Sequence, residues 1–541
     1  MVKKNSLVKN ASILMIATII SRIIGLIYRR PLGEILGSVG LGYYGYASNL
    51  YSILLLVSSY SIPMAVSKIV SERLAKKEYK NAQKIFKTAL LYAVIVGGAA
   101  ALVAFFGGSI LLPSNQQNAL PALRVLAPTI FLSAILGVLR GYFQAHHNMT
   151  PTSISQVLEQ IMNAVVSILA AWILVNSLGA GSVEKTAVYG AVGGTLGTSA
   201  GVIVGLIFML FVYFLNKKTF RKRYLRDIHG KEDSYRDAFG LIFLMVTPII
   251  LTTFINNASN YLDSYLYAGI QGMHGINANS ISAAYGEFSN YYIPVINIPL
   301  ALASASTSAM MPEVSGYFAV GDNKSANSSI NKTIKLTMFI CIPATVGLTV
   351  LAHPIMGVLF PAASDVATKL LVTGSLYVVF TALCTVTGGA LQSIGKQKTA
   401  LINAAVALGV NIASLAVMLL AAPGLDIYAV MISGIIFSVA YCILNEISIK
   451  KYLGFKARMK DTYVNPLIAS AFMAVVAAVI YYLIFFATRR PFIGLIISVI
   501  AAVAAYLVFY VLFGRIPEEE LRRYPMGTKL VKIMRLIRVY R

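Results

Sequence analysis

Runs of about twenty apolar residues recur along the whole chain, and they constrain its fold more than any other feature. A helix needs about 20 residues to cross a hydrocarbon core of about 30 Å, and backbone polar groups in lipid must find partners within the helix. Only 12% of the 541 residues are charged, whereas soluble domains carry roughly 25%. We therefore expect an all-α polytopic membrane protein with about fourteen transmembrane helices. They are placed at residues 11–29, 40–70, 84–112, 121–145, 151–177, 187–215, 239–268, 279–311, 332–352, 367–394, 399–421, 427–449, 464–487 and 491–513.

The 45 lysine and arginine residues lie mainly in alternate connections between these runs, for example at 217–226 and 450–460. Connections rich in Lys and Arg stay in the cytoplasm, so both termini are predicted to be cytoplasmic. This placement accounts for the net charge of +25 without nucleic acid as a partner. The basic, amphipathic segment 529–541 predicts a helix that lies on anionic membrane lipid rather than a docking site for a partner.

The two halves of the chain resemble one another. "RGYFQAHHNMTPT", which begins at Arg140, matches "GGALQSIGKQKTA", which begins at Gly388, in a Gly-x-x-Gln core. An even number of predicted helices separates the halves, which indicates a parallel repeat with the substrate site at the repeat interface. The expected organisation is an N-terminal six-helix lobe at 1–215, a basic cytoplasmic linker at 216–238, a second six-helix lobe at 239–450, an additional two-helix hairpin at 451–514 and a basic cytoplasmic tail at 515–541.

Polar residues form one-sided stripes on several predicted helices. Successive residues turn by about 100°, and stripes of this kind are untenable in a membrane unless they converge on a cavity. The candidate substrate-binding residues are Arg22, Arg29, Lys68, Arg140, Gln144, Glu159, Asn260, Asp263 and Glu287.

Structural roles compete with binding at several of these positions. Arg140 and Glu159 lie on neighbouring predicted helices, so a structural ion pair is as well supported as a binding role. Lys68 stands near a helix end and can snorkel to the interface, and asparagine more often joins helices than binds ligands. Arg22 and Arg29 have no acid on their own helix face, and the guanidinium fork fits phosphate oxygens, so they predict a diphosphate receptor.

The sequence offers no catalytic or metal chemistry. It has no phosphate-binding P-loop, and its three cysteines have no metal-ligand spacing and are expected to pack in the interior. We therefore predict a protein that is not an enzyme and has no cofactor, with an ion gradient or the membrane potential as its energy source. The N-terminal apolar run is interrupted by Arg22 and no small-residue cleavage site follows, which favours a retained helix over a signal peptide.

Several segments resemble a known superfamily. The repeat, "SRIIGLIYRRPLG" from Ser21, "SIPMAVSKIVSERLA" from Ser61 and "LRGYFQAHHNMTPTSISQVLEQIMN" from Leu139 are similar to the multidrug/oligosaccharidyl-lipid/polysaccharide exporters. Within that superfamily the chain most resembles the polysaccharide-transporter branch of stage V sporulation protein B and the MurJ-like lipid II flippases. The resemblance implies a bilobed bundle that alternates between inward- and outward-facing forms, and two added C-terminal helices.

The resemblance also implies a substrate. The substrate would be an anionic, undecaprenyl-diphosphate-linked sugar, and among these the resemblance favours lipid II for peptidoglycan synthesis. The chain would carry it across the bacterial cytoplasmic membrane. Cell-wall synthesis enzymes are candidate partners. Arg22 matches the Ser-Arg of the family's first helix, whereas the family's next arginine falls at Tyr28, beside Arg29. The family's arginine on the eighth helix is absent, and that helix carries Glu287. A drug/cation antiporter, a flippase for another lipid-linked polysaccharide and a non-transporting membrane scaffold are the alternatives.

Overall fold

The computed structural model describes residues 17–18, 20–60, 62–146, 148–179, 181–225, 227, 233–455 and 460–514, together with 518, 531 and 535. These residues form helices joined by short connections, with no strand among them, so the predicted all-α class is confirmed. Within the same residues eleven helices are long and apolar enough to cross a membrane. A twelfth span results if α13 (Asp365–Gly374) and α14 (Tyr377–Ser393), which meet at a 51° bend, are taken together. The count of about fourteen and the cytoplasmic termini stay predictions.

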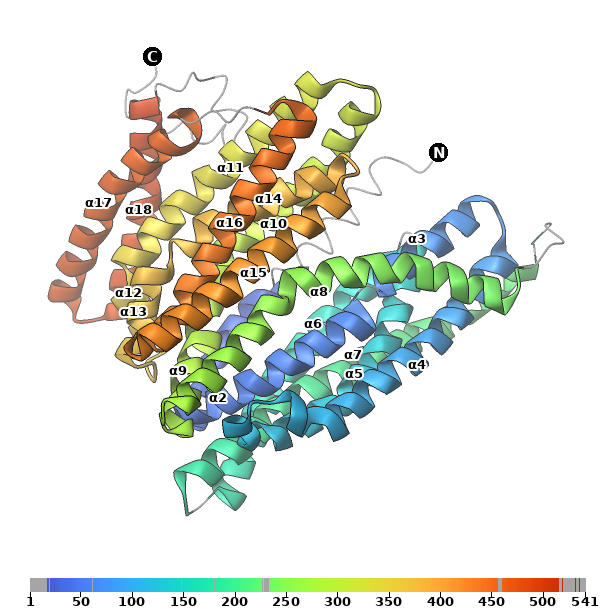
Figure 1. Ribbon diagram of the computed structural model, residues 1–541, viewed down its shortest axis with the longest axis horizontal. Helices are drawn as coiled ribbons and strands as arrows, with labels where there is room; N and C mark the ends of the chain where they lie inside the picture. The colour runs from blue at the N-terminus through green and yellow to red at the C-terminus, as the bar shows by residue number, and fades with distance from the viewer. Residues whose placement is uncertain are drawn as a thin grey trace. The chain divides into compact units, whose positions relative to one another are not determined.

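The chain divides into two compact units, Met1–Gly286 and Glu287–Arg541, and each is described by itself. The predicted lobe boundaries, in and beside the basic linker 216–238, stay predictions. In unit 1, residues 20–27 are helical. The elements that follow are α2 (Arg29–Leu55), the π-helical turn η1 (Leu56–Tyr60), α3 (Ile62–Ala75), α4 (Tyr79–Leu111), the 3-10 turn η2 (Ser114–Ala119), α5 (Leu120–Ala145), α6 (Thr150–Leu178), α7 (Val183–Leu225), α8 (Tyr235–Met273) and α9 (Ala278–Glu287) (Figure 1).

The glycine-rich segment of α7 packs against α6. Gly193, Gly197 and Gly201 recur every fourth residue and therefore share one face of the helix. A Cβ atom on Gly201 would stand 2.5 Å from the carbonyl oxygen of Glu159, and Cβ atoms on the other two would collide with α6 as well. The hydroxyl of Ser167 on α6 donates to the carbonyl oxygen of Gly194 at 2.7 Å. Close helix contact through small residues thus fixes the part of α6 that carries Glu159.

The glycine of the repeated Gly-x-x-Gln core has a packing role in both units. A Cβ atom on Gly141 would lie 2.6 Å from the carbonyl oxygen of Pro63, so α5 approaches α3 at backbone distance. In unit 2 a Cβ atom on Gly389 would collide with the methyl group of Thr307 on α10. The sequence repeat therefore corresponds to the same kind of close helix crossing in each half.

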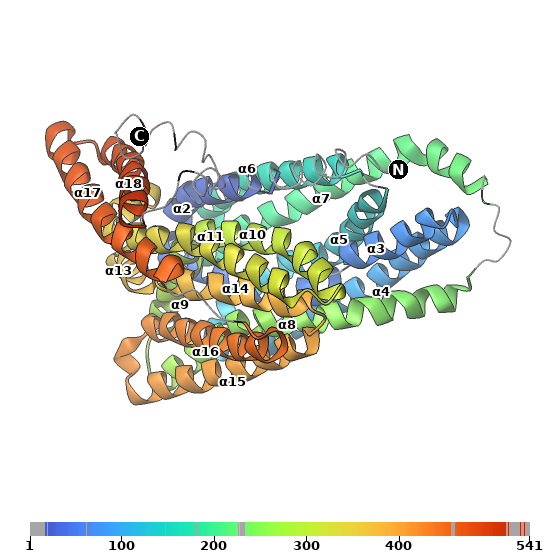
Figure 2. The same cartoon turned by 90° about the horizontal axis from the view of Figure 1, so that it is seen from above.

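Unit 2 begins with a second π-helical turn. Its elements are η3 (Phe288–Tyr292), α10 (Ile293–Ala319), α11 (Asn323–Val350), α12 (Ala352–Leu359), α13, α14, α15 (Gln397–Ala421), the 3-10 turn η4 (Pro423–Leu425), α16 (Ile427–Leu453), the π-helical turn η5 (Lys460–Val464), α17 (Asn465–Thr488) and α18 (Pro491–Gly514). The last two helices lie side by side (Figure 2). They are joined to α11 by the Tyr506 hydroxyl, which donates to the carbonyl oxygen of Phe339 at 2.8 Å.

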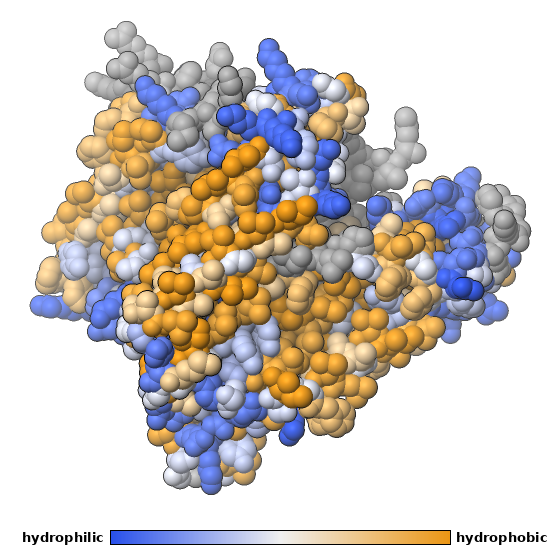
Figure 3. All heavy atoms as spheres, viewed as in Figure 1, coloured by the Kyte–Doolittle hydropathy of each residue, from blue (hydrophilic) through white to orange (hydrophobic). Residues whose placement is uncertain are grey.

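Large apolar side chains cover the outside of the helices. Phe106, Ile110, Leu244 and Ile500 are examples that are at least 65% exposed. On the face shown in Figure 3, hydrophobic residues extend along the helices and hydrophilic residues gather near their ends. Exposure of this much apolar surface to water is unfavourable, whereas contact with lipid is not. The chain is therefore a multi-pass membrane protein.

Candidate functional site

The two arginines of the predicted diphosphate receptor lie on the N-terminal helical segment. Arg22 is exposed within the helical residues 20–27, and Arg29 is half-buried as the first residue of α2. A Cβ atom on Gly25 would stand 3.3 Å from the Nε2 atom of Gln160, so this segment lies against α6. The structure thus brings the stripe of Arg22 close to the helix that carries Glu159.

Arg140 and Glu159 form an ion pair across α5 and α6. The Nη2 atom of Arg140 lies 2.7 Å from Oε2 of Glu159, and its Nε atom donates to the Ser155 hydroxyl at 2.9 Å. The two charged side chains are 15% and 30% exposed. The structural ion pair that the sequence offered as an alternative therefore forms, and it neutralises one of the positive charges counted for the site.

Lys68 and Gln144 remain outside this pair. Lys68 is exposed on α3, and Gln144 is half-buried one turn beyond Arg140 on α5. No hydrogen bond in the described part of unit 1 joins either side chain to Arg140 or Glu159. Their binding roles stay predictions that rest on the sequence.

Asn260 and Asp263 lie on α8 at a polar cluster that the sequence does not predict. The side-chain amide of Asn49 on α2 donates to the carbonyl oxygen of Asn260 at 2.8 Å and reaches the hydroxyl oxygens of Ser264 and Tyr285, each at 3.0 Å. Asp263 is buried within this turn of α8, whereas the side chain of Asn260 is exposed. The cluster joins α2, α8 and α9 within unit 1.

An aromatic contact completes the cluster. The rings of Tyr46 and Tyr285 stack with their centroids 4.3 Å apart, and Tyr46 precedes Asn49 by three residues on α2. An ionised carboxylate such as that of Asp263 is costly to bury unless polar groups surround it. Tyr46 and Asn49 are three residues apart and share one helix face, which is the sequence signal for this cluster. The signal is weak, because uncharged residues in an apolar helix seldom mark a polar site.

Glu287 occupies a different setting, in unit 2. Its carboxylate is 2% exposed and accepts from the backbone N–H of Ser364 at 3.1 and 3.2 Å. Ser364 is the N-cap of α13, and its hydroxyl in turn accepts from the N–H of Val366 at 3.2 Å. A carboxylate at a helix N-terminus is stabilised by the unpaired N–H groups and the helix dipole. Glu287 therefore holds the start of α13 in place.

A second missed cluster lies inside unit 2 and contains no charge. The amide of Asn403 donates to Oδ1 of Asn445 and to the Ser448 hydroxyl, both at 3.0 Å, and Asn445 donates to the Thr387 hydroxyl at 3.4 Å. These groups join α14, α15 and α16. Satisfied amide pairs of this kind hold helices together in a membrane.

The polar groups of the site are suited to binding a ligand. Among the described residues, no three His, Cys, Asp or Glu side chains gather closely enough to hold a metal ion. Unit 1 presents arginines on its N-terminal segment, a neutralised Arg140–Glu159 pair and the amide and hydroxyl cluster around Asn49. Such groups suit an anionic ligand with many hydroxyl or amide groups.

Together, the membrane-spanning helices, the repeated halves and these intramembrane polar groups define a transporter of the multidrug/oligosaccharidyl-lipid/polysaccharide exporter superfamily. The comparisons with known proteins agree. Residues 7–318, more than half of the chain, match the model of the polysaccharide biosynthesis protein family, and the chain belongs to that family. Residues 248–418 also match the MatE family.

Curated relatives and a solved structure match nearly the whole chain. The lipid II flippase MurJ of Bacillus subtilis (strain 168) is 25% identical over 502 residues, which cover 89% of this chain and 90% of that protein. Stage V sporulation protein B of the same organism is 23% identical and covers 98% of this chain and 99% of its own. A lipid II flippase MurJ in an inward closed conformation has a TM-score of 0.66 at 16% identity, covers 92% of this chain and 98% of its own, and shows the shared fold.

Proposed function

We propose that this chain is a flippase for undecaprenyl-diphosphate-linked sugar intermediates, and that its substrate is lipid II for peptidoglycan synthesis. Relatives of nearly full length are named lipid II flippase and stage V sporulation protein, which supports a lipid-linked cargo. The energy source would be an ion gradient or the membrane potential. Transport follows when loaded and empty forms favour different packings that lie a few kcal/mol apart.

The observation that carries this proposal is the position of Arg22 and Arg29 on the N-terminal segment, beside α6. An arginine in the middle of a membrane helix costs about 2.5–3.5 kcal/mol on insertion scales. Because its guanidinium group binds phosphate oxygens through two parallel hydrogen bonds, a diphosphate group that enters the membrane offsets this cost. Arg140 and Lys68 would assist, and Glu159, Asp263 and Glu287 would contact sugar or peptide groups or a coupling cation.

The proposal is tested in a bacterial strain that is depleted of its own lipid II flippase. Expression of the wild-type chain should restore colony formation, whereas Arg22→Ala should not and Arg22→Lys should restore it only in part. Arg30→Ala is the matched control, because Arg30 is exposed and forms an i,i+4 ion pair with Glu34 at 3.6 Å. Protein levels in the membrane must be equal in all strains.

The same experiment decides against lipid II if a well-expressed wild type fails to rescue growth. A flippase for another lipid-linked polysaccharide would then be the better assignment. A drug/cation antiporter is favoured if Asp263→Ala abolishes transport of a cationic dye while Arg22→Ala leaves it unchanged.

A further inference from the structure

The charges of the Arg140–Glu159 pair have no counterpart in the second half of the sequence repeat. Helices α5 and α6 are joined by a short turn, and so are α14 and α15. In the alignment of the two Gly-x-x-Gln cores, Gly388 takes the place of Arg140 and Ala407 takes the place of Glu159. The helix ends at the two turns agree within one residue in this alignment, so the same hairpin is built once with the two charges and once without them.

Unit 2 joins its copy of the hairpin through uncharged groups. Asn403, which corresponds to Ser155, donates to Oδ1 of Asn445 on α16 at 3.0 Å, and Asn445 donates to the hydroxyl of Thr387 on α14 at 3.4 Å. All three side chains of this connection are buried. Uncharged groups are therefore sufficient to connect the two helices, and packing of the hairpin does not by itself require an arginine and a glutamate.

An ion pair within the membrane is an energetically unfavourable way to connect two helices. Removing two charges from water costs several kcal/mol for each ion, and their attraction recovers this cost only when the geometry is favourable. Here Nη2 of Arg140 contacts Oε2 of Glu159, whereas Nε donates to the Ser155 hydroxyl. The guanidinium fork thus meets the carboxylate through one nitrogen, and not through the two parallel hydrogen bonds that a carboxylate or a phosphate can accept.

The pair lies at a depth that an anionic head group can reach. The side chains of Arg140 and Glu159 are partly exposed, so neither is sealed within the helices. Arg140 precedes the end of α5 by five residues and Glu159 follows the start of α6 by nine, which at 1.5 Å per residue places them about 8 and 14 Å from the turn. The charge pattern predicts that this turn is cytoplasmic. A phosphate group of the cytoplasmic leaflet, which lies just outside the hydrocarbon core, therefore needs to move only a short distance inward to reach Arg140.

We propose that Arg140 is an anion-binding residue and that the carboxylate of Glu159 competes with the substrate for it. A phosphate group of the substrate displaces the carboxylate and binds the guanidinium group through two parallel hydrogen bonds. The displaced Glu159 is then available for the contacts with sugar, peptide or cation groups proposed above. This inference rests on the proposed function, because it takes a diphosphate as the ligand, and it adds the residue that sets the affinity of Arg140 for that ligand.

Competition of this kind lowers the affinity for the substrate without removing its site. The apparent affinity falls with the fraction of molecules in which Arg140 has separated from Glu159. After transport, the return of the carboxylate to Arg140 favours release of the phosphate group. Glu159 thus acts on the substrate through Arg140, as a positioning residue.

Binding of farnesyl diphosphate, a short isoprenyl diphosphate, tests the competition in the full-length protein in lipid nanodiscs. Glu159→Gln keeps the size of the side chain and removes its charge. It should bind the probe about tenfold more tightly than the wild type, as expected when one hydrogen bond between charged groups no longer has to be broken. Adding Arg140→Ala to Glu159→Gln should abolish this gain. Equal affinities of the wild type and Glu159→Gln, or a gain that survives Arg140→Ala, overturn the proposal.

Glu34→Gln is the matched control for the change in net charge. The carboxylate of Glu34 is exposed and lies 3.6 Å from Arg30, so its removal should leave the affinity for farnesyl diphosphate unchanged. A gain in Glu34→Gln equal to that in Glu159→Gln would assign the effect to net charge and contradict the competition. Thermal unfolding of each variant shows that it is folded.

Infrared difference spectroscopy follows the carboxylate itself. Addition of farnesyl diphosphate to the wild type should shift a carboxylate stretching band as Glu159 leaves Arg140, and this shift should be missing in Glu159→Gln. An ion pair with a purely structural role would stay closed, and the two spectra would then agree, which contradicts the proposal.

The growth experiment described above fails or succeeds independently of this one. If the wild type does not rescue growth while Glu159→Gln binds the diphosphate more tightly through Arg140, the assignment of lipid II is wrong and the anion site is supported. Rescue by the wild type together with equal affinities of the wild type and Glu159→Gln supports the proposed function and overturns the competition.

Discussion

The guanidinium group of Arg140 on α5 lies 2.7 Å from the carboxylate of Glu159 on α6, and its Nε atom also holds the Ser155 hydroxyl. The pair ties two helices that approach each other at few other points, whereas α6 packs extensively on α7.

Removing both partners of this pair should cost less than the sum of removing each alone. Arg140→Ala leaves the carboxylate of Glu159 without its cation and should destabilise the protein by about 1–3 kcal/mol. The double variant Arg140→Ala/Glu159→Ala should be less destabilised than the sum of the single variants. A double-mutant cycle from thermal unfolding in one detergent measures the coupling. Additive effects would show that the contact contributes nothing to the fold.

The α6–α7 contact should not accept a methyl group at Gly197. A Cβ atom there would collide with the Ser167 hydroxyl and would stand 2.5 Å from the carbonyl oxygen of Asn163. Gly197→Ala should therefore lower stability by about 1–3 kcal/mol. Gly409→Ala on α15 is the control, because nothing lies within 4 Å of its Cβ position and alanine favours a helix. Equal melting temperatures for the two variants would refute the close approach.

Glu287 should control the start of α13. Glu287→Ala removes the acceptor of the Ser364 N–H group and should cost about 1–3 kcal/mol of local stability. Glu287→Gln keeps an acceptor oxygen but loses the charge, so its effect should be smaller. Hydrogen exchange over residues 364–369 measures both variants, and unchanged protection in Glu287→Ala would remove the anchoring role. Asp365→Asn, at the exposed first residue of α13, serves as the comparison.

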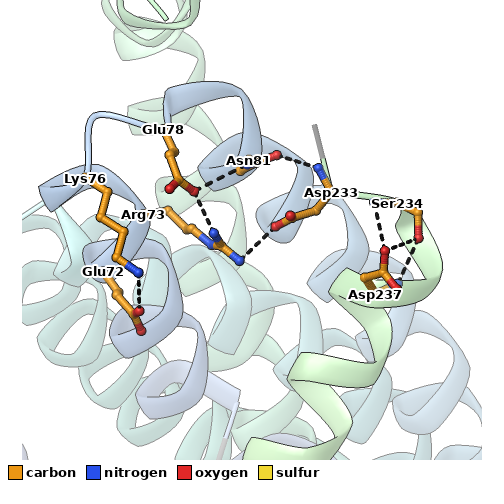
Figure 4. Close-up of polar contacts among 8 residues, drawn as sticks. All are labelled: Glu72, Arg73, Lys76, Glu78, Asn81, Asp233, Ser234 and Asp237. Carbon is orange, nitrogen blue, oxygen red and sulfur yellow. Dashed lines mark hydrogen bonds and ion pairs between the residues drawn. The ribbon is translucent and has the colours of Figure 1, made fainter. Parts of the chain in front are cut away.

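The ion pairs of Arg73 with Glu78 and Asp233, at 2.6 and 2.8 Å, join the turn between α3 and α4 to the start of α8 and should weaken in acid (Figure 4). Burial of the Glu78 carboxyl raises its pKa, but hydrogen bonds from Arg73 and Asn81 outweigh burial, and the pKa lies below its ordinary value. A group with a lowered folded-state pKa contributes stability above the unfolded value, about 4.3 for glutamate, and loses it as the pH falls through the folded value. The distance between spin labels on cysteines that replace the exposed residues Lys87 and Arg236 should thus be narrow at pH 7 and broaden below about pH 4. In Glu78→Gln this distance should already be broader at neutral pH and less sensitive to acid; an unchanged acid response would assign the effect to other groups.

The apolar runs predicted most of the helices, because length and hydropathy are local properties of the sequence. The runs at 121–145 and 399–421 nearly coincide with α5 and α15. The interruptions were not predicted: the run at 279–311 contains the π-helical turn η3, and the run at 367–394 bends by 51°. Both occur within apolar stretches, where the decisive partners come from helices distant in the sequence.

In the candidate site, too, contacts between neighbouring helices could be predicted from the sequence, whereas contacts with distant residues could not. The Arg140–Glu159 pair was foreseeable, because the two charges lie on adjacent helices joined by a short turn. The Asn49 cluster was not, because its partners Ser264 and Tyr285 are more than 200 residues away, and uncharged residues carry little signal in an apolar helix. Glu287 looked like a free ligand in the sequence, whereas its hydrogen bond to the backbone of Ser364 depends on the fold of α13.

The bend between α13 and α14 interrupts the helix, and hydroxyl groups of α11 reinforce the backbone hydrogen bond from the N–H of Val378 to the carbonyl oxygen of Ser375 at 3.0 Å. The Thr345 hydroxyl donates to the carbonyl oxygen of Ser375 at 3.3 Å, and the hydroxyls of Thr349 and Ser375 also contact one another. In a solvent that offers no hydrogen bonds, these hydroxyls take the place of water. The bend therefore receives its hydrogen bonds from side chains of the protein itself, and only apolar side chains around it need to face lipid.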